Sequence, residues 1–86
     1  MISQDFVEML RCPANRTPLS LADDALVQRM NEAIKKGRLK NSGGQTVERS
    51  VDGGLVREDR ALVYPIINDI PILLVDEGIP LDQLGS

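Results

Sequence analysis

Residues 61–75 read ALVYPIINDIPILLV, the longest predominantly apolar stretch of the chain and its clearest hairpin pattern. Two apolar runs, residues 61–67 and 70–75, flank the dipeptide Asn68-Asp69. Asn and Asp tolerate the left-handed backbone angles of a two-residue hairpin turn, so the runs are predicted to pair as antiparallel strands. Pro65 and Pro71 lack an amide proton, which predicts that they lie at edge-facing or strand-starting positions.

A short helix and a short strand are predicted before this hairpin. Ser3 can cap a helix that ends near Leu10, because its hydroxyl can accept hydrogen bonds from amides of the first turn. Phe6, Val7 and Leu10 then share one face of the helix. Residues 19–21 follow two turn-forming prolines and are a strand candidate.

A second helix is predicted within residues 24–40. Asp23 or Asp24 can cap its start and Gly37 can end it. Its apolar residues recur at helical spacing, and they are Leu26, Val27, Met30, Ala33 and Ile34. The basic residues at its end suit the negative pole of a helix, and they are Lys35, Lys36, Arg38 and Lys40.

The remaining segments complete an α+β prediction. Asp52-Gly53-Gly54 is typical of a hairpin turn, which would pair residues 46–51 with residues 55–57. Residues 78–86 lose apolar periodicity and are expected to be a flexible tail. Residues 1–77 are therefore predicted to form a single domain, a small antiparallel sheet of about four strands with an N-terminal helix and an inserted middle helix.

The composition narrows the chemistry. The 86 residues include no His and one Cys, Cys12, which excludes a histidine-based triad, an internal disulfide and a four-ligand zinc site made by this chain alone. A lone thiol fits a reducing compartment. The net charge of −3 and the two aromatic residues, Phe6 and Tyr64, argue against direct nucleic-acid binding.

No enzymatic motif is found, and we expect the chain to be neither an enzyme nor a cofactor-binding protein. Gly43-Gly44 and Gly53-Gly54 lack the lysine or the helix start that a phosphate-binding loop requires. The first residues do not form a secretory signal, and the longest apolar run, residues 70–75, is too short to span a membrane. A cytoplasmic location is therefore expected.

Two groups of residues, one near each end of the chain, form a specific pair. They are Leu10-Arg11-Cys12-Pro13 with Pro18-Leu19, and Tyr64-Pro65-Ile66 with Asp69-Ile70-Pro71-Ile72-Leu73-Leu74. Together they resemble the Trm-one-one-two-like family, which includes the bacterial YcaR-like proteins. The resemblance covers residues 4–21 and 54–77 and implies one such domain over residues 1–77, with residues 24–40 as a reduced form of the family's helical insertion.

The resemblance also carries expectations about metal and partners. Members of that family often hold zinc with a Cys-Pro-x-Cys turn and later cysteines, and eukaryotic and archaeal members activate SAM-dependent methyltransferases. Here Asn15 and Arg57 stand where relatives have cysteines. Neither side chain replaces a thiolate on zinc, so no structural zinc is expected and Cys12 is interpreted as a relic ligand.

Residues 70–75 are apolar at consecutive positions, so both faces of that strand need a cover. The helices or the tail of the monomer could supply it, or a partner protein could. The resemblance favours a non-catalytic partner or activator subunit of a methyltransferase in the translation apparatus, and the alternative is a general adaptor or a homodimer. The predicted partner-binding residues are Phe6, Leu10, Tyr64, Ile70, Ile72, Leu73, Leu74 and Val75.

Overall fold

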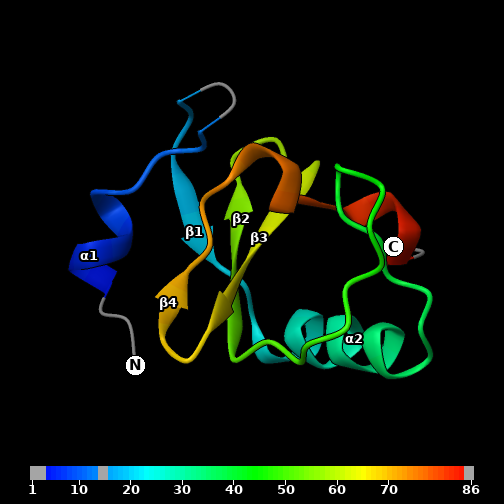
Figure 1. Ribbon diagram of the computed structural model, residues 1–86. Coiled ribbons are helices and arrows are strands. Elements are labelled where there is room, and N and C mark those ends of the chain that lie inside the picture. Colours follow the sequence, from blue (N-terminus) through cyan, green and yellow to red (C-terminus); the bar gives the residue numbers. More distant parts are fainter. Residues whose placement is uncertain (1–3, 14–15, 85–86) are drawn as a thin grey trace.

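The computed structural model describes residues 4–13 and 16–84, which build a curled antiparallel sheet with helices on both of its faces (Figure 1). Its elements are α1 (Gln4–Glu8), β1 (Leu19–Leu21), α2 (Asp24–Lys35), β2 (Gly53–Arg57), β3 (Leu62–Ile67), β4 (Ile70–Pro71), the 3-10 helix η1 (Val75–Glu77), β5 (Ile79–Pro80) and the 3-10 helix η2 (Leu81–Leu84). This architecture confirms the predicted α+β class, with its N-terminal helix and its middle helix.

The sheet follows the order β1-β2-β3, and both β4 and β5 pair with the outer edge of β3. β4 pairs with the end of β3, and β5 pairs with its beginning. The turn between β3 and β4 confirms the predicted hairpin, because Asn68 and Asp69 both take left-handed angles, with φ of 53 and 62.

Pro65 lies where the outer edge of β3 has no strand beside it. Its carbonyl accepts a hydrogen bond from the Ile72 amide beyond β4, so its proline nitrogen also faces that edge rather than β2. β4 ends at Pro71 and β5 pairs only with Leu62 and Val63. The missing amide proton of Pro65 therefore leaves no gap in the hydrogen bonds between β2 and β3. This confirms the predicted edge-facing position of Pro65.

The two faces of the sheet bury separate clusters. On the first face, the side chains of α2 such as Met30 and Ile34 pack with Val56 and Val63 of the sheet. On the second face, Val7 of α1 packs with residues of the strands and of the preceding loop, which are Cys12, Leu19, Leu55, Tyr64 and Ile66. Because side chains alternate along a strand, Leu55 and Val56 enter opposite clusters.

α2 forms as predicted. Asp23 is its N-cap, and the Asp23 carboxylate accepts a hydrogen bond from the Leu26 amide at 2.8 Å. Gly37 follows the helix with a φ of 71, which glycine adopts without strain. The expected cap of α1, Ser3, lies outside the described residues.

The predicted hairpin around Gly53-Gly54 is wrong. Both glycines are part of β2, which pairs with β1 and β3, and neither has a positive φ. Residues 46–51 form no strand beyond one bridge between Lys40 and Thr46. The Asn31 side chain instead bonds both backbone groups of Val51, at 2.8 and 3.0 Å, and so replaces a strand partner.

The expectation of a flexible tail from residue 78 is also wrong over the described residues 78–84. Ile79 is fully buried in the first cluster and pairs with Val63 through β5. The Gln83 side chain then bonds both the backbone amide and the backbone carbonyl of Lys40, at 2.9 and 2.6 Å. A few apolar and polar contacts fix this segment although it lacks sequence periodicity.

Candidate functional site

The exposed hydrophobic side chains are unevenly distributed over the described residues. All six of the large ones lie on α1 or directly after it at Met9, on β1, or on residues 70–75, which we call the strap. They are Phe6 (44% exposed), Met9 (79%), Leu21 (38%), Ile70 (60%), Leu74 (63%) and Val75 (51%). α2 and residues 78–84 contribute none of the six, because their large apolar side chains pack against the first face of the sheet.

The physical cause of this asymmetry is the size of the covering elements. The first face is covered by α2, which has twelve residues, whereas α1 has only five. α1 buries Val7 fully, and Leu10 and Leu73 are half-buried against the second cluster. A helix of this length offers too little surface to bury all the apolar residues on it and beside it, so Phe6 of α1 and Met9, which follows the helix, stay in contact with solvent.

Seven of the predicted partner-binding residues have at least part of their surface exposed. Phe6, Ile70, Leu74 and Val75 are exposed, and the other three, Leu10, Ile72 and Leu73, are half-buried. The monomer thus covers part of the strap at Ile72 and Leu73, whereas Ile70, Leu74 and Val75 remain exposed to solvent. Met9 and Leu21 were not predicted, although Met9 follows Phe6 at helical spacing.

The eighth predicted partner-binding residue, Tyr64, does not lie on the surface. Its side chain is fully buried, because β3 lies inside the sheet and the ring points into the second cluster. The phenol oxygen lies 3.0 Å from the Cys12 sulfur, with which it shares a hydrogen bond. Burial is the main cause that raises the pKa of Tyr64 above its ordinary value. Tyr64 is therefore a core residue that presents no surface to solvent.

Cys12 occupies the corner at which the resemblance would put a metal. It is buried beside Tyr64, and Arg57 lies close enough to form a hydrogen bond that contributes to the raised pKa of Arg57. The larger cause of that raised pKa is Asp59, which Arg57 contacts through Nε and Nη2 at 2.8 and 2.7 Å. Hydrogen bonds and packing thus hold this corner together.

The described residues contain no group of three or more Cys, Asp or Glu side chains arranged to hold a metal ion, and Asn15 lies outside them. Neither α1 nor α2 is long enough to cross a bilayer. The basic residues at the end of α2 are exposed and surround the turn at Gly37, as expected for a solvated helix end.

Comparison with solved structures identifies a relative. The solution NMR structure of XF2673 from Xylella fastidiosa superposes with a TM-score of 0.76 and 30% sequence identity, over 98% of this chain and 87% of that chain. The chain belongs to the XF2673 family. The likeness to XF2673 extends over nearly the whole chain, so it includes α1, the strap and the packed residues of β5. No family model matches the chain, and no curated protein does.

Proposed function

We propose that this domain is a non-catalytic partner or activator subunit that binds another protein through the exposed apolar side chains of α1, β1 and the strap. The observation that carries the proposal is that, among the described residues, all six large exposed hydrophobic side chains lie on these three segments or at Met9, directly after α1. Exposed apolar side chains that gather on a few neighbouring elements are typical of protein–protein contacts, whereas singly scattered ones are ordinary.

The proposed partner is a SAM-dependent methyltransferase of the translation apparatus. This choice is supported by the paired end motifs, Leu10-Arg11-Cys12-Pro13 and Asp69-Ile70-Pro71-Ile72, which resemble those of methyltransferase activators. The proposal includes a reducing, cytoplasmic location, which agrees with the buried thiol of Cys12, which forms no disulfide. It assigns this chain no reaction, cofactor or nucleic-acid contact of its own.

The energetics of such a contact are favourable at the strap. Full burial of a side chain such as Leu or Ile contributes about 1.5–3 kcal/mol, so covering the exposed part of Ile70, Leu74 or Val75 would contribute about 1–2 kcal/mol each. A glutamate at position 74 would instead have to be desolvated without a partner. We therefore expect Leu74→Glu to weaken the complex at least about tenfold.

The experiment is affinity capture from lysate of the source organism with the tagged wild-type chain, with Leu74→Glu and with Gln28→Glu. Gln28 is exposed on α2, so its variant adds the same charge away from the strap. The proposal predicts that a methyltransferase is retained by wild type and by Gln28→Glu and is lost by Leu74→Glu.

Retention of that methyltransferase by a folded Leu74→Glu variant would contradict the proposed surface. A chain that recovers only itself would contradict the methyltransferase. If light scattering then showed a dimer that Leu74→Glu converts to a monomer, the strap would instead be a surface for self-association.

A further inference from the structure

We infer that the cleft between α2, the β2–β3 loop and the β5–η2 segment binds a carboxylate attached to an apolar group. The cleft has a volume of about 590 Å³, which lies within the usual range for small-ligand sites. It shares none of its lining residues with the six exposed apolar residues of the proposed docking surface. The inference therefore does not depend on the proposed function.

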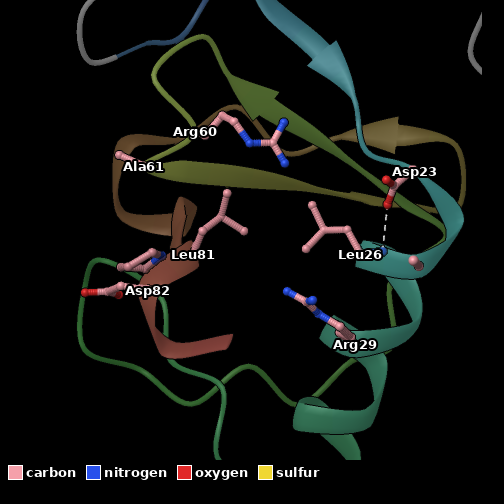
Figure 2. A pocket seen from close by; sticks show the side chains of 9 residues that line it. Asp23, Leu26, Arg29, Arg60, Ala61, Leu81 and Asp82 are labelled. Carbon is pink, nitrogen blue, oxygen red and sulfur yellow. Dashed lines mark hydrogen bonds between the residues drawn. The ribbon is translucent and has the colours of Figure 1, made fainter. Parts of the chain in front are cut away.

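Two arginines enter the cleft from opposite sides (Figure 2). Arg29 reaches in from α2, and Arg60 reaches in from the β2–β3 loop. Within the described part of the chain, neither guanidinium takes part in an ion pair or a side-chain hydrogen bond. Both guanidinium groups can therefore donate hydrogen bonds to a planar anion such as a carboxylate, whose geometry they match.

The floor of the cleft is apolar. Leu26 and Leu81, each 8% exposed, face one another between the two arginines (Figure 2). Ala61 and Pro80 also line the cleft. Water on such a floor gains little from hydrogen bonding, so an apolar group would displace it favourably. A ligand that satisfies both features carries an anionic head and an apolar body.

The two carboxylates that line the cleft favour a ligand with one negative charge over a ligand with two. Asp23 accepts the hydrogen bond of the Leu26 amide and caps α2, and the Asp82 carboxylate points away from the guanidinium groups (Figure 2). Their charges still reduce the positive potential of the cleft. A phosphate monoester carries about −1.5 to −2 charges at neutral pH and would be repelled more strongly than a carboxylate.

The backbone of Arg60 shapes the β2–β3 turn that carries its side chain. Its φ of 60 is left-handed, an angle that glycine adopts without strain, and its amide donates to the Arg57 carbonyl at 2.8 Å. The left-handed angle and this hydrogen bond close the turn between β2 and β3, from which the Arg60 side chain enters the cleft (Figure 2).

The test is a titration of the isotope-labelled full chain, followed by NMR, with hexanoate, hexyl phosphate, N-acetyl-Ala-Leu and the amide of the same dipeptide. We expect hexanoate or the dipeptide acid to give saturable shifts at Leu26, Ala61 and Leu81, and the amide to give none. Binding of the dipeptide acid alone would assign the site to a polypeptide C-terminus, and binding of hexanoate would assign it to free acids. Either result supports an apolar carboxylate.

Variants connect the shifts to the two arginines. Arg29→Gln and Arg60→Gln should each weaken binding about tenfold, since each removes a charge-assisted contact. Arg38→Gln makes the same charge change at the exposed end of α2 and should leave the affinity unchanged. Equal binding by a folded double variant, tighter binding of hexyl phosphate than of hexanoate, or the absence of any saturable shift would overturn the inference.

Discussion

Gly54→Ala tests the register of the central strands. An added Cβ on Gly54 would lie 2.7 Å from Val63 Cγ2, 3.5 Å from Ala22 Cβ and 3.7 Å from Met30 Sδ. The neighbouring Gly53 faces the other side of the sheet, where the nearest atom to an added Cβ is Ile66 Cδ1 at 3.5 Å, an ordinary contact. Two adjacent glycines of β2 should therefore respond in opposite ways.

The magnitude follows from two opposing effects. Overpacking of a core costs about 1–3 kcal/mol, and a β-branched neighbour such as Val63 has few alternative rotamers. Replacing glycine also restricts the unfolded chain, which stabilises the fold by about 0.4–1 kcal/mol. Gly54→Ala should thus lower the free energy of unfolding by about 1–2 kcal/mol, or the melting temperature by about 5–15 °C in a domain of this size. Gly53→Ala should be neutral or raise the free energy of unfolding by up to about 1 kcal/mol.

Urea unfolding followed by circular dichroism measures both variants against the wild type. A hairpin turn at Asp52-Gly53-Gly54 would require positive φ at the glycines, and both substitutions would then destabilise. Equal losses of stability, or a Gly54→Ala variant as stable as the wild type, would contradict the register in which Gly54 packs against Val63.

Three further outcomes are expected. Ile79→Ala should cost about 2–5 kcal/mol in urea unfolding, because Ile79 is fully buried, and a loss below about 0.5 kcal/mol would contradict the packed β5. Burial raises the pKa of Tyr64, the sole tyrosine, so the unfolded chain loses this proton first and stability should fall as the pH rises above about 10. Tyrosinate absorbance should therefore appear only together with unfolding, and its appearance in the folded domain would disprove the buried hydroxyl. Cys12, 1% exposed, should react with a thiol reagent only after unfolding, and prompt reaction of the native chain would contradict the buried Cys12 corner.

Local signals in the sequence predicted the elements that depend on neighbouring residues. The turn at Asn68-Asp69, the cap at Asp23 and the end of α2 at Gly37 all match the structure. Each is determined by the backbone preference or the hydrogen bonds of residues a few positions apart.

The misinterpreted segments depend on contacts that are distant in sequence. Gly53-Gly54 is a turn signal by composition, yet Gly54 is needed where Val63 packs closely against the strand. The segment after Gly78 shows no periodicity, but Ile79 and Gln83 attach it to β3 and to Lys40. No local rule reveals such pairings.

The candidate sites, too, could be predicted from the sequence only where local signals are sufficient. The apolar run of the strap identified Ile70, Leu74 and Val75, which are exposed, but it could not distinguish them from Tyr64, which is buried. Burial of a strand residue depends on which strands lie beside it. The convergence of Arg29 and Arg60 could not be predicted, because helix α2 and the β2–β3 loop meet only in the folded domain.

The most direct test of the proposed function is hydrogen exchange of the domain, measured alone and in complex with the methyltransferase that it captures. We expect that amides of α1 and of residues 72–75 exchange more slowly in the complex, while those on the exposed side of α2 are unchanged. Protection confined to α2 or to the loop around Gly44, with α1 and the strap unaffected, would contradict the proposed docking surface.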